Sequence, residues 1–177
     1  IDVATPANRA ATSEPALVPT SSQIEALTAI TDSIQAARNS AFLLHGVTGS
    51  GKTEVYLQAA AAVIARHRQV LVLVPEIALT PQFIARIENT VGGRLVVLHS
   101  QMSAGERHRA WWAASAGLAD VVLGTRLAVL APFKALGLVI VDEEHDLSYK
   151  QQDGFRYHAR DVAVKRAQVA QVPVVLG

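Results

Sequence analysis

The chain has 177 residues, of which 50% are hydrophobic and 18% are charged, so it is long and apolar enough for one globular domain. This composition excludes intrinsic disorder, and no apolar run reaches the roughly 18 residues that a membrane span needs, so we expect a soluble, cytoplasmic protein without a membrane partner. A net charge of +1 indicates no strong overall field for nucleic acid, and the lack of cysteine excludes disulfides and thiolate metal sites within this chain.

The first helix is expected shortly after an N-terminal segment without regular patterning. Residues 1–20 are rich in Ala, Pro, Thr and Ser, so we interpret them as a linker or as the tail of a preceding domain. Ser22 and Glu25 have the spacing of a capping box, and apolar residues then recur on one helical face, which predicts a helix over residues 22–38. Because the chain starts at Ile1 and stops directly after an apolar run, we expect it to be a fragment.

Strand-like and helix-like patterns alternate along the rest of the chain. Apolar runs predict strands over residues 41–45, 70–74, 95–98, 120–123, 138–141 and 172–176. Helices are predicted over 52–66, after the N-cap and N1 pair Thr80–Pro81, from the capping box Ser103–Glu106 to residue 115, and over 159–170. Strands separated by helices in this way favour an α/β fold, a parallel β-sheet with helices on both faces.

A phosphate loop is predicted between the first strand and the next helix. Residues 46–53, GVTGSGKT, match the pattern G-x-x-x-x-G-K-[ST] in the strand-to-helix context that the mechanism needs. The glycines allow backbone N–H groups to point at phosphates, Lys52 can reach the β- and γ-phosphates, and the Thr53 hydroxyl can bind Mg²⁺. The predicted ATP-binding residues here are Gly46, Val47, Thr48, Gly49, Ser50, Gly51, Lys52 and Thr53.

A second, acidic motif directly follows the predicted buried strand at residues 138–141. Its residues are Asp142, Glu143, Glu144 and His145. Carboxylates at the carboxyl end of a parallel strand lie in the crevice where such sheets bind ligands. We therefore predict that Asp142 holds Mg²⁺ opposite Thr53 and that Glu143 orients and deprotonates the attacking water. A solvated acidic turn is the alternative, which the phosphate loop upstream makes weaker.

Five segments are distinctive when they are read together. They are GVTGSGKTEVYL at 46–57, LVPEIALTPQ at 73–82, LHS at 98–100, GTRLAVLAPF at 124–133 and VDEEHDLSYKQQDGFRYHARD at 141–161. This set closely resembles the PriA family, the bacterial primosomal replication-restart helicases, which are superfamily 2 DNA helicases of the DExH type. The resemblance implies that residues 21–177 are the first RecA-like lobe of a P-loop NTPase, ending before the family's S-A-T motif.

The resemblance also implies roles for further residues. Gln23, which alone would be an ordinary surface glutamine, matches the family's adenine-contacting glutamine, and His145 matches the residue that links the γ-phosphate side to the S-A-T segment. The catalytic set is then Lys52, Asp142, Glu143 and His145. The implied DNA-contacting residues are Pro75 and Thr80 in motif Ia, Gly124, Thr125 and Arg126 in motif Ib, and Tyr149, Lys150, Phe155, Arg156, Tyr157 and Arg160 after motif II.

Residues 149–157 concentrate three aromatic side chains in an otherwise polar segment. Bases can stack on such rings, and the interleaved cations can contact phosphates, so the family interpretation is a loop that senses single-stranded DNA and signals to Glu143. The alternative is that Phe155 and Tyr157 simply pin the loop to the sheet. For Arg126, a surface salt bridge is an equally good interpretation. We expect one of Trp111 and Trp112 in the core and the other partly exposed.

For the longer protein, the resemblance implies a 3′ to 5′ DNA helicase that uses ATP and Mg²⁺ at stalled or repaired replication forks and initiates primosome assembly. Its implied partners are fork and single-stranded DNA, primosome proteins and single-stranded DNA-binding protein, in the bacterial nucleoid. A zinc module is implied only outside this chain. The alternatives are another DExH motor, acting on RNA or in a restriction enzyme, and a non-catalytic DNA-binding module; intact Lys52, Thr53, Asp142 and Glu143 argue against the latter.

Overall fold

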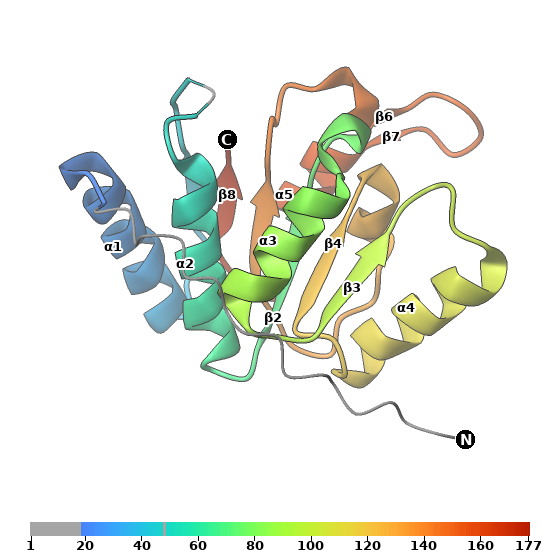
Figure 1. Cartoon of the computed structure of the whole chain (residues 1–177), viewed down its shortest axis with the longest axis horizontal. Helices are drawn as coiled ribbons and strands as arrows, with labels where there is room; N and C mark the ends of the chain where they lie inside the picture. The colour runs from blue at the N-terminus through green and yellow to red at the C-terminus, as the bar shows by residue number, and fades with distance from the viewer. Residues whose placement is uncertain (1–18, 48) are drawn as a thin grey trace.

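The computed structural model describes residues 19–47 and 49–177, which form an α/β fold around one central sheet. Six parallel strands lie in the order β1-β8-β5-β2-β4-β3 (Figure 1). Their bounds are β1 (Ala41–Leu43), β2 (Gln69–Leu73), β3 (Leu95–Leu98), β4 (Val121–Gly124), β5 (Leu136–Val141) and β8 (Val174–Leu176). The predicted parallel sheet is confirmed, whereas most of the predicted linker lies outside the described residues.

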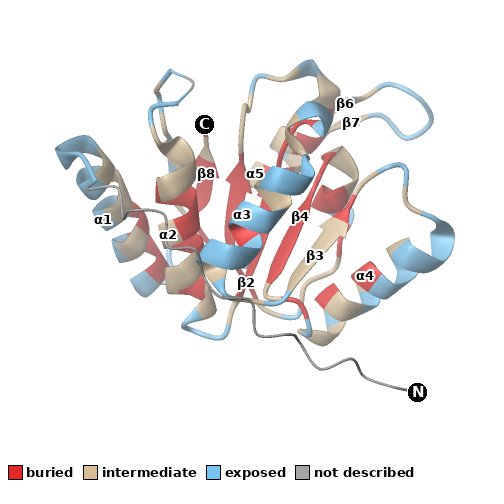
Figure 2. Ribbon diagram, in the orientation of Figure 1, coloured by how far each residue is buried: buried red, intermediate tan, exposed pale blue. Residues whose placement is uncertain are grey.

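Helices cover both faces of the sheet, as the alternating pattern predicts. The helices α1 (Ser21–Gln35), α2 (Lys52–Ile64) and α3 (Pro81–Val91) pack on one face, and α4 (Ala104–Ala116) and α5 (Ala159–Ala170) pack on the other. Side chains of β2 alternate between the two cores, with Val70 and Val72 on the first face and Leu71 and Leu73 on the second. The buried residues lie between these layers (Figure 2). None of the described helices has the length and apolar character to cross a membrane.

The helix N-termini follow the predicted capping chemistry with one correction. Thr20 is the N-cap of α1 and forms a capping box with Gln23, so the prediction that used Ser22 and Glu25 is two residues too late. Thr20 has extended backbone and its side chain accepts a hydrogen bond from the Gln23 N–H, which is the geometry that an N-cap requires. The capping box at Ser103 and the Thr80 cap before Pro81 are confirmed.

The last strand is shorter than the apolar run predicts, because two residues of that run have other roles. The Val172 N–H donates to the Ala167 carbonyl at 3.0 Å and so closes the end of α5. Pro173 has no N–H to give to a strand ladder. The strand β8 therefore begins at Val174 and pairs with β1 and β5.

The two tryptophans of α4 differ in exposure, as the sequence predicts. Trp111 packs against the hydrophobic core, and Trp112 is mostly exposed. Only the first can therefore contribute much burial to the fold.

Short elements form after the strands, at the edge where the strands end. They are the 3₁₀ helices η1 (Glu76–Ala78), η2 (Arg126–Leu130) and η3 (Leu147–Tyr149), and the antiparallel hairpin of β6 (Lys150–Gln151) and β7 (Tyr157–His158). The predicted DNA-sensing loop is thus a hairpin whose tip, residues 152–156, projects from the body beside η3 (Figure 1).

Candidate nucleotide and DNA site

The polar segments that the sequence singled out meet at one edge of the sheet. The phosphate loop follows β1, residues 75–80 follow β2, residues 124–126 begin at the last residue of β4, and residues 142–145 follow β5. Because these strands are parallel, their carboxyl ends share one edge, the usual ligand-binding edge of an open α/β sheet. In Figure 1 this edge carries the phosphate loop, the C-terminal residue and the β6–β7 hairpin.

The phosphate loop has the backbone geometry of an anion site. Gly49 and Gly51 have φ angles of 84° and 85°, in the left-handed region that favours glycine. Gly51 is the N-cap of α2, and because it has no side chain, the first N–H groups of the helix have no side-chain cap. These groups and the helix dipole can therefore face a phosphate. The predicted contribution of Thr48 lies outside the described residues.

Gln23 lies against the phosphate loop and links it to α1. Its side-chain carbonyl accepts a hydrogen bond from Thr20 N–H at 2.8 Å, and its amide donates to the Ser50 carbonyl at 3.0 Å. A Cβ atom at Gly51 would lie 2.2 Å from the Gln23 Nε2 atom, so a larger residue there would displace the Gln23 side chain, and the left-handed φ angle is what requires glycine. Gln23 is therefore not an ordinary surface residue, although its amide is engaged within the protein.

Asp142 directly follows β5 and is partly buried. Its N–H continues the sheet ladder by donating to the Leu73 carbonyl at 2.9 Å. Burial raises the pKa of the Asp142 carboxyl, and the negative charge of Glu143 adds to this effect, while the nearby Tyr56 hydroxyl and Lys52 ammonium oppose it. A partly buried carboxylate that lies near a cation and a second carboxylate could ligate a metal ion.

Glu143 has an unusual backbone conformation for its residue type. Its φ angle of 47° lies in the left-handed region, where a non-glycine residue is strained. The Glu143 carbonyl accepts from Asp146 N–H at 2.8 Å, which closes a turn. The exposed His145 places Nε2 3.7 Å from a Glu143 carboxylate oxygen. His145 is thus beside the predicted base, while its link to an S-A-T segment stays a prediction.

Two of the three arginines assigned to DNA contacts, Arg126 and Arg160, make other contacts within the lobe. Arg160 forms an ion pair with Glu144 at 2.8 Å and a second one with Asp161 at 3.0 Å. Arg126 donates to the main-chain carbonyls of Ser148 at 3.1 Å and Lys150 at 3.3 Å. The surface salt bridge considered for Arg126 is wrong, because its partners are carbonyls. Arg126 therefore holds the segment after motif II, and Arg160 connects α5 to motif II itself.

Tyr149 is placed differently from the prediction. Its side chain is fully buried in the core, and its hydroxyl donates to the main-chain carbonyl of Asp142 at 2.6 Å. A ring without exposed surface cannot stack on a base in this conformation, so the assignment of Tyr149 as a DNA contact is wrong for this structure. Burial raises the pKa of its hydroxyl, and the nearby Asp142 carboxylate acts in the same direction. Tyr149 instead anchors η3 to motif II.

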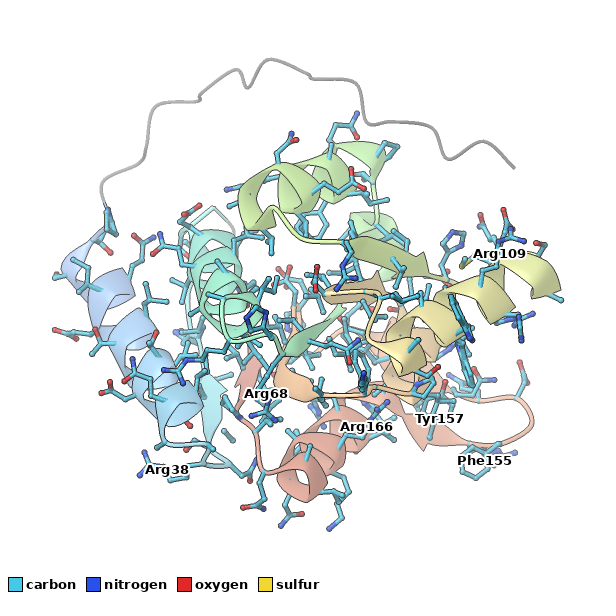
Figure 3. The ribbon with its side chains drawn as sticks, turned by 90° about the horizontal axis from the view of Figure 1, so that it is seen from below. Arg38, Arg68, Arg109, Phe155, Tyr157 and Arg166 are labelled. Carbon is cyan, nitrogen blue, oxygen red and sulfur yellow. The ribbon has the colours of Figure 1, made fainter. Side chains whose placement is uncertain are left out.

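The other two aromatic residues of the hairpin differ from Tyr149 and from each other. Phe155 is 80% exposed at the hairpin tip, and Tyr157 is partly buried with its hydroxyl 3.5 Å from the Arg126 carbonyl (Figure 3). Their ring centroids are 6.0 Å apart. The proposal that Phe155 pins the loop is therefore wrong, whereas Tyr157 is partly pinned. Lys150 and Arg156 are exposed on the same hairpin.

Motifs Ia and Ib contribute mainly to the fold in this structure. Thr80 caps α3 by accepting from the Phe83 N–H at 3.2 Å, and Pro75 and Thr125 are buried. Gly124 is packed so closely that a Cβ atom would lie 2.1 Å from the Leu98 carbonyl oxygen. The side chains of Pro75 and Thr125 therefore serve packing, while DNA contact by the backbone N–H groups of these two segments stays a prediction.

Three residues near this edge were not predicted from the sequence. Tyr56 places a buried hydroxyl near Asp142. Ile77 and Leu147, in η1 and η3, are 87% and 84% exposed although both are apolar. Helical spacing from Lys52 could have suggested Tyr56, since residues four apart share a helix face. No periodic signal marks an exposed residue in a 3₁₀ turn.

The donor set at this edge fits Mg²⁺ and not a metal held by protein alone. No group of three or more His, Cys, Asp or Glu side chains within residues 19–47 and 49–177 is placed to hold a metal ion. Mg²⁺ in nucleotide sites needs only one or two protein ligands, because it keeps several waters and binds the phosphates. The Thr53 hydroxyl and the partly buried Asp142 carboxylate could provide that kind of donor set.

The fold and this edge define a helicase motor domain. The family model described as DEAD/DEAH box helicase matches residues 20–175, and the chain belongs to that family. Among solved structures, RecG bound to a three-way DNA junction has a TM-score of 0.61 at 23% identity, covering 89% of this chain and 20% of that chain. The DUF1998 helicase MrfA has a TM-score of 0.60 at 20% identity, covering 92% and 27%. These likenesses confirm the RecA-like fold.

Within the helicases, the chain is similar to replication restart protein PriA. It is 46% identical over 158 residues to that protein from Bacillus subtilis, covering 89% of this chain and 20% of the relative. It is 50% identical over 155 residues to the protein from Treponema pallidum, covering 88% and 23%. The chain of 177 residues therefore spans about a fifth of the length of these relatives. The resemblance predicted from the sequence is confirmed.

Proposed function

We propose that residues 21–177 are the first motor lobe of a longer ATP-dependent DNA helicase, preceded by a linker or a further domain. The whole protein would move 3′ to 5′ at stalled or repaired replication forks and initiate primosome assembly. The observation that carries this proposal is the meeting of the phosphate loop with Asp142 and Glu143 at one sheet edge, in a chain similar to PriA.

At the nucleotide site, each proposed role follows from position and charge. Lys52, at the start of α2, stabilises the negative charge on the transferring phosphate, and Glu143 orients and deprotonates the attacking water. Thr53 and Asp142 would hold Mg²⁺, which supplies charge neutralisation at the phosphates when it is bound. Gln23 would exchange its contact with Ser50 for an adenine edge when nucleotide binds. His145 is proposed to act with Glu143 on the γ-phosphate side.

On the DNA side, the β6–β7 hairpin is the proposed sensor. The exposed Phe155 is available for base stacking, and the exposed Lys150 and Arg156 are available for phosphates. The hydroxyl of Tyr149 and the guanidinium of Arg126 join the base of this hairpin to the Asp142 backbone and to η2. A base stacked on Phe155 would therefore act on motif II through contacts that this lobe already contains.

The remaining proposals concern the longer protein. By similarity, its partners are forked and single-stranded DNA, primosome proteins and single-stranded DNA-binding protein. A zinc module would lie outside this chain, which has no cysteine. The proposed location is the cytoplasm, at the bacterial nucleoid.

The nearest alternative is a DExH motor that acts on RNA or serves a restriction enzyme, because neither groove motif distinguishes a 2′-hydroxyl group. The test is ATP hydrolysis by the full-length protein with a DNA fork, an RNA fork of the same sequence, and linear duplex DNA. The proposal expects the strongest stimulation from the DNA fork. Equal stimulation by the RNA fork would favour an RNA motor, and the absence of hydrolysis with every substrate would favour a non-catalytic module.

A further inference from the structure

Tyr56 is a second residue of α2 that reaches the nucleotide edge. It lies one helical turn after Lys52, on the same face of the helix. Its ring is buried, and its hydroxyl packs over the end of β8, where a Cβ atom at Gly177 would lie 1.7 Å from the hydroxyl oxygen and 3.5 Å from the Lys52 Cδ atom. The side chains of Tyr56 and Lys52 therefore both lie beside Gly177, which follows β8 at this sheet edge.

The Tyr56 hydroxyl is buried and makes no hydrogen bond of regular geometry with the described residues, although the Asp142 carboxyl lies close enough to influence its pKa. Buried hydroxyl groups almost always have a partner, because an unpaired one has lost its bonds to water without replacement. Phenylalanine would fill the same space without this loss. The contrast with Tyr149 is direct, since that buried hydroxyl donates to the Asp142 carbonyl at 2.6 Å. Packing alone therefore does not explain why this buried residue is tyrosine and not phenylalanine.

The charged groups that face the Tyr56 hydroxyl are those of motif II. Burial raises the pKa of Tyr56, and the carboxylates of Asp142 and Glu143 add to the shift. In return, the hydroxyl stabilises the ionised form of the Asp142 carboxyl. The hydroxyl stays protonated at every physiological pH, so it is a hydrogen-bond donor that lies beside the carboxylate assigned to Mg²⁺.

We propose that Tyr56 is a positioning residue whose hydroxyl donates to the Asp142 carboxylate when Mg²⁺ and ATP are bound. This inference rests on the proposed function of the site. A carboxylate that ligates a metal is generally held by a hydrogen bond from a neighbouring group, and loss of that group typically costs about 10- to 100-fold in metal affinity. The bond turns the carboxylate toward the position opposite Thr53.

The test uses the full-length protein and a fluorescent, non-hydrolysable ATP analogue, whose binding is titrated with Mg²⁺. Tyr56→Phe removes one oxygen atom and keeps the buried ring. We expect the Mg²⁺ concentration at half-saturation to rise about tenfold, with unchanged binding of the analogue in EDTA. The matched control is Ser33→Ala, which removes a buried hydroxyl that donates to the Arg38 carbonyl at 2.9 Å near the C-terminal end of α1; its half-saturation point should stay within about twofold of the unsubstituted protein.

A double-mutant cycle with Asp142→Asn separates positioning from packing. If Tyr56 acts on that carboxylate, Tyr56→Phe adds no further shift in the Asp142→Asn protein. An unshifted Mg²⁺ midpoint in Tyr56→Phe, equal shifts in Tyr56→Phe and Ser33→Ala, or a lower melting temperature of Tyr56→Phe without nucleotide would overturn the inference alone. An unsubstituted protein whose affinity for the analogue is independent of Mg²⁺ would overturn the proposed function as well.

Discussion

The phosphate loop and the β6–β7 hairpin lie at the same sheet edge, but they are built in different ways. The loop is continuous with a buried helix, and its function depends on backbone N–H groups and on left-handed glycines. The hairpin has two strands of two residues each and is attached through the side chains of Arg126 and Tyr149. The nucleotide site is therefore fixed by backbone conformation, and the proposed DNA sensor is fixed by a few side chains.

Because of this difference, we expect substitutions in the two regions to affect different properties of the protein. Changes at the backbone-defined site should remove chemistry, whereas changes at the hairpin should alter how DNA controls it. A hairpin with few buried contacts belongs to the part of a fold that opens most easily, which suits a segment that responds to a ligand. The buried Tyr149 connects the two regions, since its hydroxyl contacts Asp142 directly.

The largest effect is expected from Lys52→Ala in the full-length protein. Removal of the ammonium takes a point charge from the transferring phosphate, so DNA-stimulated ATP hydrolysis should fall by about three orders of magnitude. Steady-state phosphate release measures this, and fork binding by fluorescence anisotropy should be retained. Near-normal turnover would mean that nucleotide binds elsewhere.

Glu143→Gln should separate binding from chemistry at the same edge. The amide keeps the shape and loses the base, so turnover should fall about a hundredfold or more, while Mg²⁺-dependent ATP binding persists. Isothermal titration and phosphate release on one preparation give both quantities. Parallel loss of affinity and turnover would show that Glu143 has a structural role, which its strained backbone would then explain.

Phe155→Ala should affect the hairpin without affecting the nucleotide site. Loss of one stacking ring should weaken the apparent affinity of DNA in the ATPase assay by roughly 1 to 3 kcal/mol, with basal hydrolysis unchanged. The control is Trp112→Ala, since Trp112 is an exposed aromatic residue on α4, away from the hairpin. An unaltered response to single-stranded DNA would exclude Phe155 as the sensor.

The smallest effect is expected from Tyr149→Phe, which keeps the buried ring. Loss of its hydrogen bond to Asp142 should lower the free energy of unfolding by about 1 kcal/mol, a shift of roughly 2 to 4 °C in melting temperature for a domain of this size. Scanning calorimetry measures this. A melting temperature equal to that of the unsubstituted protein would show that the contact does not stabilise motif II.

The proposed nucleotide site could be recognised in the sequence because its parts are local. The glycines, the lysine and the threonine all lie within residues 46–53, and Asp142 directly follows an apolar strand. The order of the strands was not predicted, but the alternating pattern was enough to place both segments at one edge. The N-cap of α1 lies two residues before the predicted position, because Thr20 and Ser22 both have a hydroxyl group that can cap a helix.

The exposure of the hairpin side chains was less predictable, because it depends on contacts with residues that are distant in the sequence. Tyr149, Phe155 and Tyr157 are alike in composition, yet one is buried under Asp142, one is exposed and one is intermediate. The partners of Arg126 lie 22 and 24 residues further along the chain, on carbonyls that no residue pattern marks. The unpaired hydroxyl of Tyr56 is likewise visible only once β8 and β5 lie side by side.

The most direct test is an experimental structure of the full-length protein with Mg²⁺ and a non-hydrolysable ATP analogue. We expect the β- and γ-phosphates at the N-terminus of α2, beside Lys52, with Mg²⁺ between the Thr53 hydroxyl and the Asp142 carboxylate. A nucleotide bound elsewhere, or a metal ion that contacts neither residue, would contradict the assignment of this sheet edge as the ATP site.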